Sequence, residues 1–307
     1  MRIAIVGAGG IGCIYGAALA KAGAEVIFIA RGAHLAAMQA NGLKIEGDRG
    51  ETVLESVQAT DDPGSIGVVD YVIFCVKLWD VESAGAAIKP MVGPETAVIP
   101  QQNGVDAHER LIPILGREAM MAGTAWVTGS ITAPGVVRQT GTYQRLIYGE
   151  IDGRMSQRGQ ALANLCAEAG FNGEFEPDVL VPIWEKFLGI VPLSSVNSLT
   201  RVPLGIYRED PELWKLFEGA LRETIAVGHA EGIALPEDSF DKVSAQTRAM
   251  PPHHMTSMCN DLLRGNRIEL PWFAGKVVEL GRKHDIPTPT CNLLHAALKP
   301  HVNGKVN

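Results

Sequence analysis

The stretch that decides the fold is RIAIVGAGGIG, residues 2–12. Its first half is an apolar run rich in Ile and Val, as in a strand that is covered on both faces. The run leads into Gly7, Gly9 and Gly12, spaced as G-x-G-x-x-G, and the apolar segment 11–23 follows with a helical pattern. A strand, a glycine turn and a helix in this order predict a dinucleotide-binding βαβ unit.

The three glycines of this turn have separate physical roles. The first permits the tight turn, the second lets the backbone approach a pyrophosphate, and the third lets helix and strand pack closely. The free N–H groups and the positive dipole end of the helix favour phosphate. A glycine-rich turn without a ligand is the alternative. We expect the cofactor to contact the whole turn, namely Gly7, Ala8, Gly9, Gly10, Ile11 and Gly12.

Strand and helix signals continue to alternate after the turn, as expected of successive βαβ units. Further buried strands are predicted in EVIFIAR (25–31), VVDYVIFCVK (68–77) and TAVIPQQNG (96–104). Shorter and more exposed strands are predicted in GLKIEGD (42–48), GVVRQTG (135–141) and QRLIYGE (144–150). We expect the shorter strands to extend the same sheet in antiparallel fashion.

The pattern changes near Glu176-Pro177, after which helical periodicity dominates. Helices are predicted over 178–198, 211–231, 254–264, 270–284 and 290–298. The fold class is therefore an α/β, Rossmann-type doubly wound sheet over residues 1–176, followed by an all-α domain over residues 177–307. No long linker separates the predicted domains.

Composition excludes several classes of function. The chain has 307 residues and a net charge of −7, so its overall field does not attract nucleic acid or an acidic membrane surface. Its longest apolar runs have the length of strands, and it begins directly in a strand without the layout of a signal peptide. The five cysteines form no C-x-x-C pair, which favours reduced thiols in a cytoplasmic protein. The eight histidines lack metal-ligand spacing, so we expect no metal site.

The residues after the second and third buried strands point to the type of cofactor. NAD sites place an acidic residue after the second strand, whereas this chain has Arg31 in FIARGAH. An arginine fork suits the 2′-phosphate of NADP, and a surface arginine without a role is the alternative. Lys77 lies at the carboxyl end of its strand, where open α/β sheets bind ligands, and adds a second positive charge. We therefore predict NADP(H) as the cofactor.

The stretch PIWEKFLGIV, residues 182–191, places a lysine in an unusual setting. As a helix it is apolar on most sides, yet Lys186 lies in its middle, and lysine is seldom buried without a partner. The lysine can act as an acid in catalysis. Alternatively, it reaches solvent or pairs with Glu185 or Asp178.

The motifs GAGGIG, AR, CVK, QNGV, WEK and TSMCND followed by RIE occur together along the chain. In their order and spacing the chain resembles the ketopantoate reductase (2-dehydropantoate 2-reductase) family over nearly its full length. The resemblance implies a Rossmann domain and a helical domain similar to that of 6-phosphogluconate dehydrogenase. It also implies reduction of a small 2-keto acid to a 2-hydroxy acid with NADPH, a step of pantothenate biosynthesis.

The resemblance implies roles for four residues, each of which has a local alternative. Lys186 matches the general acid of the family, and Glu269 matches its acidic residue, although it could instead pair with Arg264 or Arg267. Asn103, which matches the asparagine of QNG at the cofactor and the substrate, could simply form an Asn-Gly turn. Ser257 matches the serine that binds substrate and could instead cap a helix.

The chain also departs from the family pattern. Family members commonly carry asparagines four and eight positions after the lysine, where this chain has Ile190 and Ser194. Glu269 is followed by Leu270-Pro271 in place of the usual Ile-Asp or Val-Asp. These changes leave hydride chemistry intact and indicate a different, more apolar keto acid. Asn197 is a candidate to replace a missing asparagine.

Two other functions compete with this prediction. One is another NADP-dependent hydroxyacid or opine-type dehydrogenase on the same two-domain plan, and the other is a redox sensor that binds NADP without turnover. The lysine within WEK, at the start of the helical domain, favours the keto acid reductase. We expect a homodimer, since helical second domains often supply an interface.

Overall fold

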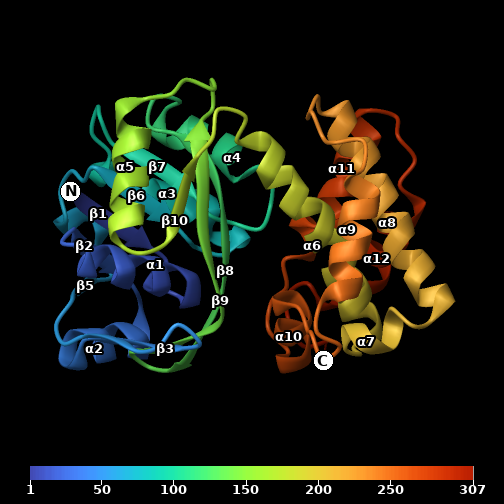
Figure 1. Cartoon of the computed structure of the whole chain (residues 1–307), viewed down its shortest axis with the longest axis horizontal. Helices are drawn as coiled ribbons and strands as arrows, with labels where there is room; N and C mark the ends of the chain where they lie inside the picture. Colours follow the sequence, from blue (N-terminus) through green and yellow to red (C-terminus); the bar gives the residue numbers. More distant parts are fainter. Residues whose placement is uncertain (307) are drawn as a thin grey trace. The chain divides into compact units, whose positions relative to one another are not determined.

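The computed structural model describes residues 1–306, and the chain divides into two compact units, Met1–Leu180 and Val181–Asn307. The boundary predicted from the sequence, Glu176-Pro177, lies a few residues before this division. The first unit is an α/β structure and the second is helical, as expected (Figure 1).

The first unit contains a five-stranded parallel sheet in the order β5-β2-β1-β6-β7. Its strands are β1 (Arg2–Val6), β2 (Glu25–Ile29), β5 (Gln58–Thr60), β6 (Tyr71–Phe74) and β7 (Ala97–Pro100). The order reverses direction at β1, which is the arrangement of a doubly wound fold. The sequence predicted four of these strands and missed β5, which has only three residues.

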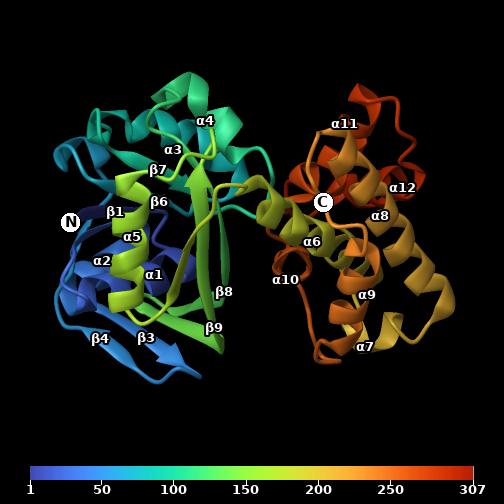
Figure 2. The ribbon, with the colours of Figure 1, turned by 45° about the horizontal axis from the view of Figure 1, so that its top comes forward.

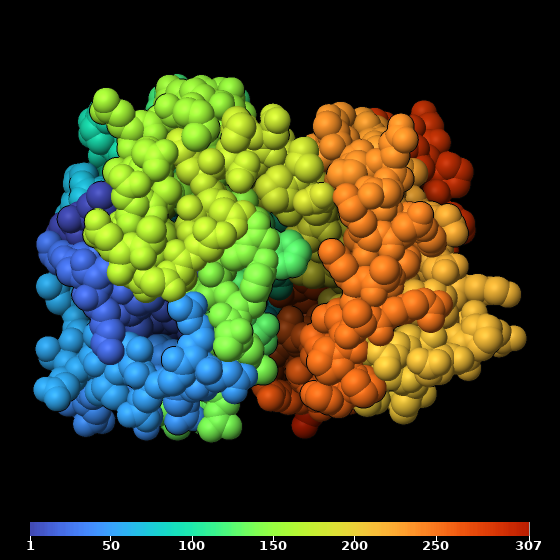
Figure 3. Space-filling model, in the orientation of Figure 1, coloured from blue at the N-terminus to red at the C-terminus, as the bar shows by residue number. Residues whose placement is uncertain are grey.

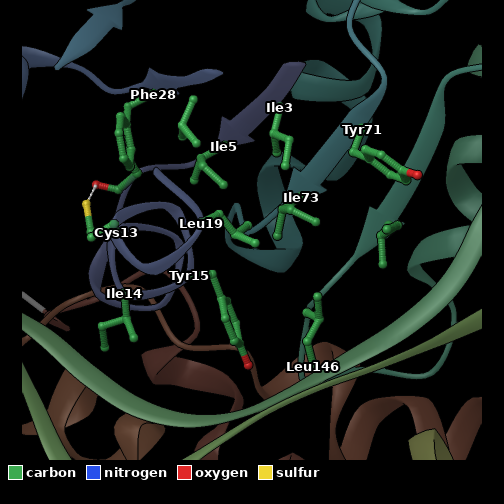
Figure 4. Packing of buried hydrophobic residues seen from close by; sticks show 14 of the residues in the cluster. Ile3, Ile5, Cys13, Ile14, Tyr15, Leu19, Phe28, Tyr71, Ile73 and Leu146 are labelled. Carbon is green, nitrogen blue, oxygen red and sulfur yellow. Dashed lines mark hydrogen bonds between the residues drawn. The ribbon is translucent and has the colours of Figure 1, made fainter. Parts of the chain in front are cut away.

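Helices cover both faces of this sheet. The alternation of side chains along β1 sends Ile3 and Ile5 into one apolar cluster and Ala4 and Val6 into another. Figure 4 shows the first cluster, in which residues of the sheet pack against α1. The helices of this unit are α1 (Gly10–Lys21), α2 (Gly32–Asn41), α3 (Val81–Ala87), α4 (Ala107–Leu115) and α5 (Gln157–Glu168). Short 3₁₀ turns lie at Pro63–Ser65, Leu78–Asp80 and Lys89–Met91.

The shorter strands form a second sheet, so the prediction that they extend the first one is wrong. This sheet has the order β10-β9-β3-β4, with β8 paired to β9. Figure 2 labels four of its strands, β3, β4, β8 and β9. The strands are β3 (Leu43–Gly47), β4 (Thr52–Leu54), β8 (Met121–Ala133), β9 (Val136–Glu150) and β10 (Asn172–Phe175). Only β3–β4 and β8–β9 are antiparallel, while β9 pairs in parallel with both β3 and β10.

Two of the predicted short strands are parts of the single strand β9. Its first half alternates buried and exposed residues, so the polar side chains between the two apolar runs mark an exposed face and not a break. Its second half is largely buried, because the second sheet packs on α1. Tyr15 of α1 spans this contact and donates a hydrogen bond of 2.6 Å to the carbonyl of Arg145 (Figure 4).

A cavity of about 220 Å³ opens beside the second half of α1. It is bordered by Lys21 of α1, Arg49 of the β3–β4 turn and Glu168 of α5. Figure 3 shows the hollow between the yellow-green surface of α5 and the light-blue surface of the β3–β4 turn. No residue of the glycine turn lines this cavity.

The second unit consists of helices. They are α6 (Leu180–Thr200), α7 (Leu204–Tyr207), α8 (Pro211–Ala230), α9 (Ser239–Ala249), α10 (Ser257–Arg264), α11 (Ala274–Lys283) and α12 (Pro289–Leu298), with 3₁₀ turns at Leu270–Trp272 and Lys299–His301. All five predicted helical ranges fall on helices, but α7 and α9 were missed. The helix α9 buries only Ser239, Val243 and Thr247, so it carries little apolar periodicity.

Packing inside this unit fixes the first half of α6. Its buried residues include Ile183, Trp184, Phe187 and Leu188, as the apolar pattern predicted. Gly228 of α8 makes room for the indole, because a Cβ there would lie 3.0 Å from the Trp184 ring. No helix within residues 1–306 combines the length and the apolarity that a membrane crossing requires.

Candidate active site

The glycine turn lies where the order of the strands reverses. Gly7 has a φ of +88°, and a Cβ there would lie 2.8 Å from the backbone nitrogen of Val76. The amide of Cys75 donates a hydrogen bond of 2.7 Å to the carbonyl of Val6, so the ends of β1 and β6 meet at this point. Ligands of doubly wound folds bind at such a reversal of strand order.

The start of α1 is shaped to receive an anion. Gly9 is the N-cap, no side chain caps the helix, and the first turn has no acidic residue. The N–H groups of the next three residues have no acceptor within the helix. A Cβ on Gly9 would meet no atom within 4 Å apart from its chain neighbours, whereas one on Gly12 would lie 2.6 Å from the carbonyl oxygen of Gly7. Open space above unpaired N–H groups fits the pyrophosphate of a dinucleotide.

Arg31 lies at the carboxyl edge of the same sheet. It is the N-cap of α2, has an extended backbone and is exposed. The amide of Ala8 donates a hydrogen bond of 2.9 Å to the carbonyl of Ile29, so the glycine turn lies against the end of β2. Arg31 and the glycine turn therefore share one edge of the first unit, as the prediction of an NADP site requires.

Lys77 follows β6 at this edge and is exposed. Its ammonium lies 5.6 Å from the centre of the Trp79 ring. Arg110 of α4 fixes the segment by donating a hydrogen bond of 2.7 Å to the carbonyl of Leu78 while its guanidinium binds both carboxylate oxygens of Glu82. Nothing in the sequence singles out Arg110, because its hydrogen-bond partners Leu78 and Glu82 lie more than 25 positions away.

Asn103 lies in the loop after β7 and is partly buried. Its neighbour Gln102 is 6% exposed and donates two hydrogen bonds of 3.0 Å, to the carbonyls of Phe74 and Val76. These bonds join the loop after β7 to the end of β6. Gln102 is thus a residue that the sequence reasoning missed, although it precedes Asn103 in the QNG motif.

Lys186 lies on α6 in the helical unit and is partly buried. Burial lowers the pKa of its ammonium to about 7, and the charge of Glu269 acts in the opposite direction. Glu269 is 6% exposed and immediately precedes the 3₁₀ turn Leu270–Trp272. The structure therefore brings Lys186 and Glu269 together within one unit, across 83 positions of sequence (269 − 186).

The other groups predicted to pair with these two residues are exposed. Glu185 and Asp178 are exposed, and Glu269 is the charged group that acts on the pKa of Lys186. Arg264 and Arg267 are also exposed, whereas Glu269 is buried. A buried carboxylate beside a partly buried ammonium stabilises the charged form of the lysine.

Ser257 is the first residue of α10 and is exposed. The cap of this helix is Thr256, whose hydroxyl accepts a hydrogen bond of 3.3 Å from the amide of Cys259. The alternative that Ser257 caps the helix is therefore wrong. As an exposed residue at a helix N-terminus, Ser257 is suited to contact an anion, which keeps it a candidate for the substrate carboxylate.

Asn197 has a structural role and does not replace a family asparagine. It is 1% exposed, and its amide nitrogen donates a hydrogen bond of 2.6 Å to the carbonyl of Val202. Its amide oxygen accepts bonds of 2.8 and 3.1 Å from the amide and the hydroxyl of Thr256. The side chain thus joins α6 to the start of α10 and is not available to a substrate.

The two positions that depart from the family pattern follow Lys186 along α6. Ile190 is partly buried and Ser194 is 4% exposed. Residues four apart lie on the same face of a helix, so Ile190 shares a face with the lysine. This face therefore presents an apolar side chain where the family commonly has an amide.

The comparisons with known proteins agree with this architecture. The family described as "Ketopantoate reductase PanE/ApbA" matches residues 3–153, and its C-terminal counterpart matches residues 178–302. A 2-dehydropantoate 2-reductase of Mesorhizobium japonicum is 30% identical over 97% of each chain. A PanE/ApbA family ketopantoate reductase from Ralstonia eutropha has a TM-score of 0.91 at 32% identity over 98% of each chain. A D-mandelate dehydrogenase with NADH and anilino(oxo)acetate bound has a TM-score of 0.88 at 22% identity over 98% of each chain and shares the fold.

A doubly wound α/β unit with a glycine turn, followed by a helical unit that holds a lysine beside a buried carboxylate, defines a class of two-domain oxidoreductases. The family matches cover most of both units. The chain belongs to the ketopantoate reductase PanE/ApbA family.

Proposed function

We propose that this protein reduces a 2-keto acid, either ketopantoate or a related compound, to the 2-hydroxy acid with NADPH. The observation that carries the proposal is the partly buried Lys186, whose pKa is lowered to about 7 beside the buried Glu269. The names of the relatives, 2-dehydropantoate 2-reductase and ketopantoate reductase, support the same reaction.

The first unit would hold the cofactor. The unpaired N–H groups at the start of α1 would bind the pyrophosphate, and Arg31 would bind the 2′-phosphate with its guanidinium. Lys77 and Asn103, both on loops at the same edge of the sheet, would complete the contacts. The bound cofactor supplies the hydride that reduces the ketone carbon.

Lys186 would supply the proton. Reduction of a ketone places negative charge on the carbonyl oxygen, and an ammonium near that oxygen stabilises the charge and then protonates it. A general acid works best when its pKa is near the operating pH, which an ordinary lysine does not satisfy. Burial brings the pKa of Lys186 to about 7 and so meets this requirement.

Glu269 would keep Lys186 charged and in place. The carboxylate raises the pKa of the lysine and so limits the lowering that burial causes. Asn103 and Ser257 would contact the substrate, with the serine directed to its carboxylate. Assignment of these residues rests on their match to the family motifs and on their positions in each unit.

The direct test is a spectrophotometric assay of the purified protein. NADPH is mixed with a panel of 2-keto acids, and its oxidation is followed by absorbance. Turnover of a 2-keto acid is the expected result. Binding of NADPH without turnover of any 2-keto acid would contradict the proposal and favour a redox sensor. Oxidation of hydroxyacids or opines with NADP⁺, without reduction of any 2-keto acid by NADPH, would favour the other dehydrogenases.

Substitution of Arg31 by alanine should weaken the binding of NADPH far more than the binding of NADH. A hydrogen bond to a charged group is worth roughly 1.5–3 kcal/mol, which corresponds to about tenfold to a hundredfold in affinity. Dissociation constants for both cofactors, measured by titration of the wild type and the variant, decide the question. Equal losses for NADPH and NADH would show that Arg31 does not bind the 2′-phosphate.

Ketopantoate should be a poor substrate relative to the best 2-keto acid of the panel. Ile190 and Ser194 remove amide groups that the family commonly places after the lysine. A site built to hydrogen-bond a polar substrate group discriminates strongly, whereas an apolar pocket discriminates weakly. The panel should include phenylglyoxylate, because a D-mandelate dehydrogenase shares the fold. If ketopantoate ranks first in kcat/KM, Ile190 and Ser194 do not change the substrate preference away from ketopantoate.

A further inference from the structure

His34 of α2 connects three segments of the first unit. Its Nδ1 accepts a hydrogen bond of 3.1 Å from the amide of Gly135, in the turn between β8 and β9. Its Nε2 lies 3.6 Å from the sulfur of Cys13 in α1. The carbonyl of Ala8, in the glycine turn, also acts on the ring and raises its pKa.

These contacts fix the protonation state of the imidazole. Because Nδ1 accepts a bond from a backbone amide, it cannot carry a proton, so the proton of the neutral ring lies on Nε2. This nitrogen lies 3.6 Å from the sulfur of Cys13, which can accept from it. Burial lowers the pKa of His34, which favours the neutral ring that this arrangement requires.

The contacts converge on a single peptide group of the glycine turn. The amide of Ala8 donates to Ile29, at the end of β2, and its carbonyl accepts a hydrogen bond of 3.3 Å from the thiol of Cys13. Figure 4 marks this thiol bond with a dashed line at Cys13. His34 joins α2 to this group through its contact with the sulfur of Cys13.

Arg31, the N-cap of the same helix, lies three positions before His34. The histidine therefore fixes the N-terminal turn of α2, and with it the backbone of Arg31, against the peptide that precedes Gly9. The β8–β9 turn also packs against the next turn of α2, since a Cβ on Gly135 would lie 3.3 Å from the Cβ of Ala37. His34 thus links the helix that carries Arg31 at its N-cap to the glycine turn.

We propose that His34 is a positioning residue for the cofactor, which sets the glycine turn and Arg31 at the spacing of the pyrophosphate and the 2′-phosphate. Its proposed role is indirect and involves no contact with the cofactor. The inference rests on the proposed use of NADPH and goes beyond it, because it names a residue that determines the preference for NADPH through another residue.

The test compares three substitutions at His34 with a control on the same helix. H34A removes all contacts of the ring. H34N keeps an acceptor near the position of Nδ1, and H34Q keeps a donor near the position of Nε2. The control Q39A removes a hydrogen bond of 2.9 Å from Gln39 to the carbonyl of Ala59, which joins α2 to β5 and not to the glycine turn.

Dissociation constants for NADPH and NADH are measured for each full-length variant, together with kcat at saturating NADPH. We expect H34A to weaken the binding of NADPH about tenfold and the binding of NADH less than about threefold. Changes of this size correspond to the loss of one hydrogen bond. The value of kcat should stay within about twofold, because the chemistry depends on Lys186. Each of H34N and H34Q should restore part of the preference for NADPH, and Q39A should leave it unchanged.

The possible outcomes separate this inference from the proposed function. If the wild type prefers NADPH and the His34 variants keep that preference, His34 is not a positioning residue while the proposed cofactor stands. If H34A and H34N bind NADPH and NADH more weakly by the same factor, the histidine only stabilises the fold, which also contradicts the inference. If the wild type binds neither cofactor, the proposed function itself is wrong.

Discussion

Substitution of Lys186 by alanine should lower kcat for 2-keto acid reduction by about 10² to 10⁴, the range for loss of a positioned general acid. The affinity for NADPH should change little, because the glycine turn and Arg31 belong to the other unit. Substitution by arginine should also fail, since a guanidinium does not release its proton near neutral pH. Steady-state kinetics with the best 2-keto acid of the panel measure the loss.

A matched control for this variant is an exposed lysine of the same unit. Lys215 lies on α8 and is exposed, so K215A should leave kcat and KM unchanged. Circular dichroism should show that both variants keep their helices. If K186A retains near-normal turnover with any good substrate, Lys186 is structural and the proposed mechanism is wrong.

Substitution of Gly9 by valine should abolish cofactor binding while the fold persists. Gly9 has a φ of −85°, and a Cβ there meets no atom within 4 Å apart from its chain neighbours, so a Cβ has room at this position. The isopropyl group would instead occupy the space above the N–H groups of α1. Loss of two charge-assisted hydrogen bonds to the pyrophosphate costs roughly 3–6 kcal/mol, or at least about a hundredfold in affinity.

The adjacent glycine provides the contrasting control. A Cβ on Gly10 would lie 2.3 Å from the carbonyl oxygen of Gly129 in β8, so G10A should lower the melting temperature. G9V should leave the melting temperature nearly unchanged, and G9A should lose less affinity than G9V. Titration with NADPH and thermal unfolding of the three variants separate the two roles. Unchanged NADPH affinity in G9V would show that the pyrophosphate does not lie on this turn.

Local signals in the sequence predicted the parts of the fold that depend on nearby residues. The strand β1, the glycine turn and α1 are adjacent, and each is encoded by its own apolar periodicity and glycines. The arrangement of β3 and β9 was not predictable in this way. Their parallel pairing joins Lys44 to Val136 and depends on long-range packing against α1. Exposed polar residues in β9 also made one strand look like two.

In the candidate site, too, local sequence signals predicted some residues, while others depend on contacts between distant segments. Lys186 stood out because a charged residue within an apolar helix is unusual, and the resemblance to the family indicated Glu269. Gln102 and His34 gave no such signal, because an amide or an imidazole in a loop or a short helix has many ordinary roles. The contact of Gln102 with the carbonyl of Val76 and that of His34 with the sulfur of Cys13 arise only when elements distant in sequence meet.

The measurement that tests the central claim most directly is the pH dependence of kcat/KM for keto acid reduction in the wild type and in E269Q. A general acid must be protonated, so kcat/KM should fall as the pH rises through the pKa of Lys186, which is about 7. Because the carboxylate of Glu269 raises that pKa, E269Q should move the fall to lower pH. A profile that stays flat through neutral pH, or a fall that E269Q moves to higher pH, would contradict the assignment of Lys186 as the acid.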